Sequence, residues 1–144
     1  MLEAENSSAE TYVSFRICAQ ELDFDDISGN LHLTPDQVNR YGEHPRGNPR
    51  YAPYKQAMWS IDSKLPLTEP LEAHLIAILS LLEPSHAYLQ SLAQRAKMDF
   101  YSTIFNKNGV QLSPQTLKRI TNLGAGLGVT VYPGEDAVAI SSSS

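Results

Sequence analysis

The chain has 144 residues, 42% of them hydrophobic and 19% charged, with a formal net charge of −5. This length suits one domain, and the apolar share suits a packed core rather than a disordered chain. The acidic balance argues against general affinity for nucleic acid. The sequence contains no run of about 18 apolar residues, the length needed to cross a bilayer. The single cysteine excludes an internal disulfide framework and a cysteine zinc site.

The two ends of the chain have the composition of tails. Residues 1–10 are acidic and polar, which predicts a disordered tail and does not match a secretory signal. Residues 134–144 end in a run of serines and predict a flexible tail. We therefore expect a single α+β domain over residues 11–133 and a cytoplasmic protein.

Alternating apolar residues begin the predicted domain. They predict a strand over residues 12–18, whose buried face consists of Val13, Phe15 and Ile17. Asp23 or Asp25 can cap a helix over 24–31, because aspartate accepts hydrogen bonds from the free N–H groups of a first turn. A further short turn is expected to continue through Val38.

The strongest helix pattern spans residues 71–82, after a predicted strand over 55–64. Trp59 falls on the apolar face of that strand, so we expect it in the core. Apolar residues nearly encircle the helix, which predicts a central helix covered on most sides. Thr68 is the expected N-cap, and Pro84 is expected to end or kink the helix.

The last third contains a predicted helix over 85–95 and a strand over 98–106 with apolar residues on both faces, typical of a central strand. A helix capped by Ser113 follows, and a strand over 127–131 ends the domain. Gly124 is the expected residue just past that helix, whose inward side chains should be Leu117, Ile120 and Leu123.

The element order β-α-β-α-α-β-α-β predicts an α+β fold with a single four-stranded sheet and three to four helices mainly on one face. Residues 12–62 and 98–132 each form a strand–helix–strand unit. We expect the two strands of each unit to lie parallel through a right-handed crossover. The order of the strands within the sheet does not follow from the sequence.

The sequence contains no catalytic or metal-binding pattern. Its four histidines show no metal-ligand spacing, so no metal and no cofactor is predicted. His74 is expected to be packed in the central helix, and Cys18, with no activating base nearby, to be a buried structural thiol. The glycines of 124–128 follow a helix and precede a strand, the reverse of a dinucleotide loop. An enzyme is disfavoured, although catalytic groups can assemble from distant positions.

Charge is unevenly distributed, which indicates two candidate binding surfaces. The first is acidic and would bind a partner through Glu21, Asp23, Asp25 and Asp26, although helix capping also accounts for the aspartates. The second is the proline-rich loop 40–55, where basic and aromatic residues could bind anions, although a solvated loop is the simpler interpretation. Its candidate residues are Arg40, Arg46, Arg50, Lys55 and Tyr51.

Several segments together resemble a known family. They are YVSFRICAQELDFDDIS, LTPDQVNRYGE, AMWSIDSK with LEAHLIAILSLLEP, and DFYSTIFNKNGVQLSPQTLKRITNLGAGLGVTVY, spread over about residues 11–132. This pattern is similar to a bacterial family described as domain of unknown function four-two-seven-nine. The resemblance implies a small α+β domain and transfers no catalytic residue, because the family has none established. By analogy with other small bacterial families, it suggests an immunity protein.

Two functions of different classes follow. The first is a small non-enzymatic protein-binding domain, in its specific form an immunity-type inhibitor of a bacterial toxin or effector, with a basic partner favoured by the acidic surface. The alternative is binding of an anionic ligand or nucleic acid through loop 40–55. A hydrolase that uses His74 or Cys18 is a third hypothesis and requires a concave pocket beside an acid. No membrane partner is expected, and the sequence leaves the oligomeric state open.

Overall fold

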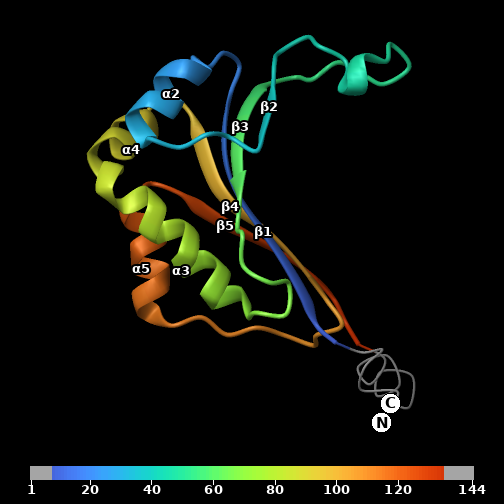
Figure 1. Ribbon diagram of the computed structural model, residues 1–144, viewed down its shortest axis with the longest axis vertical. Coiled ribbons are helices and arrows are strands. Elements are labelled where there is room, and N and C mark those ends of the chain that lie inside the picture. Colours follow the sequence, from blue (N-terminus) through green and yellow to red (C-terminus); the bar gives the residue numbers. More distant parts are fainter. Residues whose placement is uncertain (1–7, 135–144) are drawn as a thin grey trace.

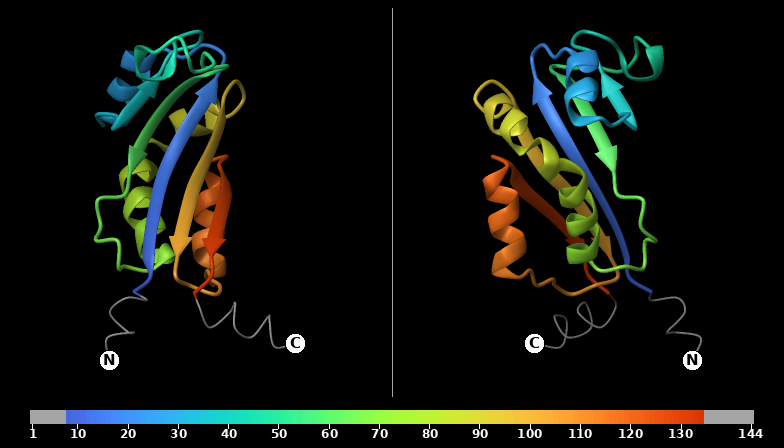
Figure 2. Two further views of the ribbon diagram at one scale, coloured as in Figure 1. Left: turned by 90° about the vertical axis from the view of Figure 1, so that its right-hand side faces the viewer. Right: turned by 60° about the vertical axis from the view of Figure 1, so that its left-hand side comes forward.

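The computed structural model describes residues 8–134, which form one open sheet with helices packed on one of its faces (Figure 1). The strand order is β2-β3-β1-β4-β5. The strands are β1 (Glu10–Ala19), β2 (Gln37–Asn39), β3 (Ala57–Asp62), β4 (Lys97–Phe105) and β5 (Gly126–Tyr132). The helices are α2 (Phe24–Leu31), α3 (Leu71–Leu82), α4 (His86–Leu92) and α5 (Pro114–Asn122), with 3-10 turns η1 (Pro45–Gly47) and η2 (Glu83–Ser85). The α+β class and the placement of helices on one face agree with prediction (Figure 2).

The predicted tails lie mostly outside the described residues. Segments 1–7 and 135–144 fall there entirely. β1 begins at Glu10, inside the segment predicted as the N-terminal tail, because Glu10 pairs with Phe105 on β4.

The core lies between the covered face of the sheet and the helices. Phe15, Trp59 and Phe100 are fully buried on this face, and Leu79 of α3 is fully buried above it. These strand positions share one face because side chains alternate along a strand. The prediction that Trp59 belongs to the core is confirmed. Its indole Nε1–H donates a hydrogen bond to Ser28 Oγ at 3.0 Å, which ties β3 to α2.

The sheet has five strands, so the prediction of four is wrong. The additional strand is β2, at the position where the sequence predicted a short turn through Val38. Val38 pairs with Trp59, and β2 runs antiparallel to β3. Three residues are too few to show a period-2 pattern, and β2 is defined by its pairing with a strand about twenty residues later in the chain.

Strand direction was predicted correctly for one of the two units. β4 and β5 are parallel, as expected, because residues 106–125 return the chain to the start of β4, where Gly126 pairs with Asp99. β1 and β3 are antiparallel instead, with Ala57 beside Ala19. The chain between them stays at one end of the sheet, with α2 and the long loop (Figure 1), so β3 starts where β1 ends and runs back along it.

The central helix α3 has the predicted bounds but a different cap and a more exposed outer side. Its N-cap is Pro70 rather than Thr68, without a side-chain hydrogen bond. Ile76 and Leu81 are 38% and 49% exposed, so the prediction of a helix covered on most sides is wrong. The helices form a single layer on the sheet, which leaves the outer face of α3 to solvent.

The last helix, α5, begins and ends as the sequence predicts. Ser113 is its N-cap and accepts a hydrogen bond from the Thr116 N–H at 3.2 Å. Ile120 and Leu123 are buried as expected, but Leu117 is 43% exposed. The inward stripe begins at Thr116, which is buried, and continues at steps of four and three, so Leu117 lies about 100° away around the helix.

Two carboxylates attach α5 to the neighbouring α3–η2 segment. Glu72 accepts hydrogen bonds from Ser113 Oγ and Thr116 Oγ1, each at 2.7 Å, and from the Ser113 N–H at 3.1 Å. Glu83 accepts two hydrogen bonds of 2.7 Å from Arg119. Hydrogen bonds from Ser113 and then Thr116 lower the pKa of Glu72, and the hydrogen bond from Arg119 lowers the pKa of Glu83.

Acid is therefore expected to weaken this attachment. A carboxyl group whose pKa is lowered in the folded state stabilises the fold above its unfolded pKa, close to 4.5 for glutamate. That stabilisation is lost as pH falls through the lower folded value. We expect the urea concentration at the unfolding midpoint to decrease as the pH is lowered below about 4.5. In Glu83→Gln this decrease should be smaller, because the variant has already lost about 0.5 kcal/mol of solvent-screened ion pairing at neutral pH. Urea titrations from pH 7 to pH 2.5 measure the midpoint of each protein. If the midpoint depends on pH equally in the wild type and in Glu83→Gln, Glu83 does not contribute to the acid sensitivity.

The sheet face opposite the helices is polar and aromatic. Arg16 on β1 donates two hydrogen bonds to Asp99 on β4, at 3.0 and 2.9 Å, and its guanidinium lies 4.4 Å from the Tyr101 ring centre. Cys18 lies on this same face, opposite Lys97. It is only half-buried, so the prediction of a buried thiol is wrong, because position 18 alternates away from the core.

Candidate functional site

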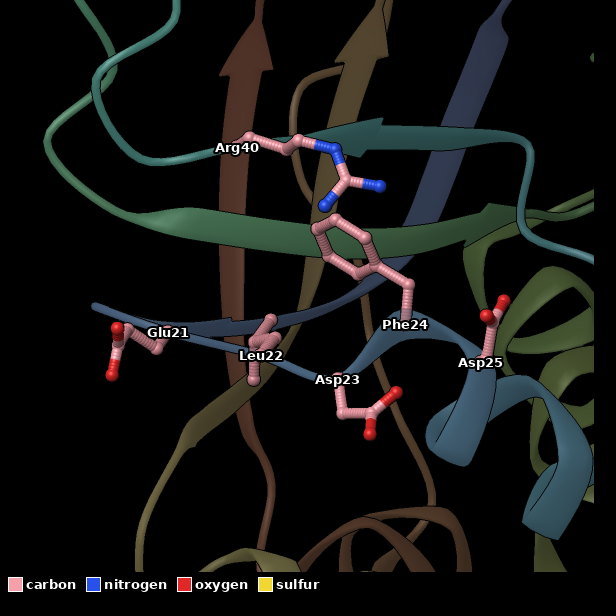
Figure 3. Close-up of a pocket in the computed structure, with 6 residues that line it drawn as sticks. All are labelled: Glu21, Leu22, Asp23, Phe24, Asp25 and Arg40. Carbon is pink, nitrogen blue, oxygen red and sulfur yellow. The ribbon is translucent and has the colours of Figure 1, made fainter.

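The acidic residues predicted as a binding surface lie at the turn between β1 and α2. We call Glu21, Asp23, Asp25 and Asp26 the acidic turn. The first three line an open hollow of about 480 Å³ together with Leu22, Phe24 and Arg40 (Figure 3). All four carboxylate-bearing residues are exposed. The structure therefore brings the predicted acids to one surface and adds two apolar side chains and one cation.

Two of the four acids have structural partners. Asp23, one of the two caps that the sequence allowed, caps α2 by accepting a hydrogen bond from the Asp26 N–H at 3.0 Å. Asp26 accepts one from Tyr88 Oη at 3.1 Å and one from Asn30 Nδ2 at 3.2 Å. Burial, and then the hydrogen bond to Asp26, raise the pKa of Tyr88 to about 12. Asp23 and Asp26 therefore hold the helix in place.

The other two acids, Glu21 and Asp25, have free carboxylates. Within residues 8–134 neither side chain makes a hydrogen bond or an ion pair. Figure 3 shows the carboxylates of Glu21, Asp23 and Asp25 spread along the turn and pointing in different directions. Such an arrangement suits several separate contacts with a partner surface better than joint coordination of one ion.

Arg40 completes this surface from a distant part of the sequence. Its guanidinium lies 4.9 Å from the centre of the Phe24 ring, a cation–π contact. The sequence assigned Arg40 to the basic loop and indicated no binding role for Phe24 or Leu22. The contact depends on β2, which ends at Asn39 and delivers Arg40 to the turn, so it could have been predicted only if β2 had been recognised.

A smaller hollow of about 120 Å³ continues the surface toward α4. It is lined by Glu21 and Asp26 of the acidic turn and by Tyr88 and Arg95, among others. Arg40 thus lines the first hollow with Glu21, Asp23 and Asp25, and Arg95 lines the second with Glu21, Asp23 and Asp26. The surface remains acidic overall, with apolar side chains between its charges.

The second predicted surface, the basic loop, is not assembled into one site. The segment extends beyond the end of the sheet, away from the helices (Figure 1). Lys55 lines an open hollow of about 560 Å³ with Tyr41 and Tyr54, and neither Arg46 nor Arg50 lines it. Among residues 8–134, Arg46, Arg50 and Lys55 form no ion pair, and Tyr51 is 48% exposed.

Neither residue of the hydrolase hypothesis is poised for chemistry. His74 is 1% exposed, and its Nδ1 lies 2.6 Å from Ser63 Oγ, so the prediction of a packed histidine is confirmed. Burial lowers the pKa of His74, which keeps the ring neutral near pH 7. Burial raises the pKa of the Cys18 thiol, which disfavours the nucleophilic thiolate. A substrate has no access to His74 in this conformation.

Between residues 8 and 134, no three histidine, cysteine or acidic side chains are grouped as ligands of a metal ion would be. No helix in this part of the chain combines the length and apolar character that a bilayer crossing requires.

These features define a small α+β domain built on one open five-stranded sheet with a layer of helices on one face. A family model described as "Domain of unknown function (DUF4279)" matches residues 9–134, and the chain belongs to this family. The match confirms the resemblance found from the distributed sequence segments. Comparisons with curated proteins and with solved structures gave no match.

Proposed function

We propose that this chain is a non-enzymatic protein-binding domain that uses the acidic turn to bind a basic partner. The observation that carries the proposal is that the free, exposed carboxylates of Glu21 and Asp25 line the same hollow as the half-buried apolar side chains of Leu22 and Phe24. Protein interfaces commonly combine an apolar centre with a charged rim, and this turn has both within five consecutive residues.

The charge of the acidic turn would act mainly on the rate of association. Complementary charge steers two proteins into encounter and can raise the association rate by tenfold or more at low ionic strength. A stoichiometric inhibitor of a toxin with a basic face would gain from this, because it must bind before the toxin reaches its target. An immunity-type inhibitor is therefore the specific form of function that we propose.

The experiment is capture of a partner followed by charge reversal. The tagged protein is incubated with lysate of its native cells, and proteins that elute at low and high salt are identified by mass spectrometry. For the captured protein, Glu21→Lys with Asp25→Lys is expected to slow association by at least about tenfold at low salt. The matched control is Glu10→Lys with Glu69→Lys, which changes net charge equally at two other exposed positions and should leave the rate within about twofold.

Two outcomes of this experiment would contradict the proposal. If the Glu21 and Asp25 variant associates as fast as the control and remains folded by circular dichroism, the acidic turn is not the binding surface. If no protein is captured at either salt concentration, the protein-binding function itself loses its support.

A second candidate function uses the basic loop to bind an anionic ligand or nucleic acid. It is favoured by the three cations Arg46, Arg50 and Lys55, which have no ion-pair partner in the described residues, and by the exposed ring of Tyr51. Its signature in the same experiment is nucleic acid that elutes with salt, since released counterions make such binding salt-dependent. Arg46→Ala with Arg50→Ala should then abolish the retention, whereas charge reversal at the acidic turn should not.

A further inference from the structure

The strand β5 forms one edge of the sheet in the described part of the chain, and alternate backbone groups along it point away from β4. It pairs only with β4 in the described part of the chain. The Tyr132 carbonyl accepts a hydrogen bond from the Asn106 N–H at 2.9 Å, so Tyr132 directs its backbone groups toward β4. Backbone direction alternates along a strand, which means that Leu127, Val129 and Val131 direct their N–H and C=O groups outward.

Among the described residues, β5 itself has none of the sequence features that usually keep a sheet edge from pairing. β5 contains seven residues, none of them charged and none of them proline. The opposite edge, β2, has only three residues and two polar amides, Gln37 and Asn39. Long, uncharged edge strands are templates for a further strand, whereas short edges with polar or charged residues are protected. Val129 and Tyr132 are also 37% and 51% exposed.

The residues of β5 are complementary to those of a second β5 in an antiparallel arrangement. With the two-fold axis at Val129, Leu127 lies opposite the partner's Val131, and Val129 opposite the partner's Val129. On the other face, Gly128 lies opposite the partner's Thr130 and Gly126 opposite the partner's Tyr132. Each glycine thus faces a larger side chain, and open space surrounds both glycines. An aromatic ring packed over a cross-strand glycine is a recognised way to stabilise such a pair.

We propose that β5 binds β5 of a second copy of this chain, which joins two five-stranded sheets into one continuous sheet. The three outward-facing residues of each strand would exchange about six main-chain hydrogen bonds. No charge repulsion opposes the contact within β5 itself. The acidic turn follows the end of β1, and β4 lies between β1 and β5, so dimer formation would leave the acidic turn free.

The first test is the mass of the full chain in solution. Sedimentation equilibrium from micromolar to near-millimolar protein is expected to show a reversible shift from the mass of one chain to twice that mass. Val129→Lys places two cations opposite each other at the centre of the contact and should keep the protein monomeric over this range. A wild-type chain that stays monomeric near millimolar concentration, or a folded Val129→Lys variant that still dimerises, would overturn the proposal. Glu21→Lys with Asp25→Lys should dimerise as the wild type does.

A cross-linking test determines the register and does not depend on the folding of the lysine variant. In a Cys18→Ser background, Val129→Cys places two thiols on directly opposed residues of a hydrogen-bonded pair, whose Cα atoms lie about 5.5 Å apart. This distance suits a disulfide. We expect oxidation to convert most of this protein into a covalent dimer. Val131→Cys, which faces residue 127 of the partner instead, should remain largely uncross-linked. Equal cross-linking at both positions would reject the proposed register.

Discussion

Trp59→Ala is expected to lower the free energy of unfolding by about 3–5 kcal/mol, the usual range for removing a fully buried aromatic side chain. Trp59 is 0% exposed on the covered face of the sheet, so alanine would leave a cavity that the surrounding core can only partly fill. The variant also loses the hydrogen bond to Ser28, which anchors α2 against β3. Urea unfolding followed by far-ultraviolet circular dichroism measures the loss, because the chain's single tryptophan fluorophore is removed.

Two companion variants separate the contributions at this position. Ser28→Ala removes only the hydrogen-bond acceptor and should cost about 1 kcal/mol. Trp59→Phe keeps an aromatic ring but is smaller and cannot donate, so it should fall between the other two variants. A Trp59→Ala protein that loses less than about 1 kcal/mol would show that this residue is not packed as the structure describes.

The position of Trp59 also links stability to the proposed function. Its hydrogen bond reaches Ser28 on α2, whose first turn is capped by Asp23 of the acidic turn. A weakened contact between β3 and α2 would therefore loosen the surface on which Glu21 and Asp25 are displayed. Charge reversal at those two exposed positions should instead alter binding with little effect on stability, which allows the two effects to be separated.

Elements with local determinants could be predicted from the sequence. The central helix has the predicted bounds, Leu71–Leu82, and the cap at Ser113 and the helix end at Gly124 are both observed. These features depend on interactions between residues three to five positions apart, which a short window of sequence contains. The prediction of Thr68 as the N-cap was wrong because the helix begins at Leu71, directly after Pro70, whose ψ of 161° is extended and keeps it outside the helix.

Features that depend on distant partners could not be predicted. β2 is a strand only because β3 lies beside it, and the direction of β3 follows from the path of the loop between residues 40 and 56. In the candidate site, too, local features could be predicted from the sequence and contacts between distant residues could not. The acids of the turn are evident in the sequence, but the approach of Arg40 to Phe24 requires β2, and the engagement of Asp26 requires Tyr88 from α4.

Gly124→Ala is expected to destabilise the protein by about 2–4 kcal/mol, from two costs that act together. Gly124 has a φ of +82°, a left-handed conformation that costs an L-residue about 1–2 kcal/mol. It ends α5 in a Schellman motif, in which the Ala125 N–H bonds to the Ile120 carbonyl and the Gly124 N–H to the Thr121 carbonyl, at 3.3 and 2.9 Å. An added Cβ would also lie 2.8 Å from Ala93 Cβ, so the turn after α4 must move.

The matched control is Gly29→Ala, which makes the same chemical change with the opposite expected sign. Gly29 lies within α2, and an added Cβ would meet nothing within 4 Å. Alanine should stabilise the helix by about 0.5–1 kcal/mol, because it restricts the unfolded chain and favours the helix. Urea unfolding of both variants, followed by Trp59 fluorescence, measures the difference. If Gly124→Ala leaves the urea midpoint unchanged or raises it, then Gly124 is not required for the left-handed turn or for the close approach to Ala93. Opposite shifts would show that the end of α5 needs a residue without a side chain.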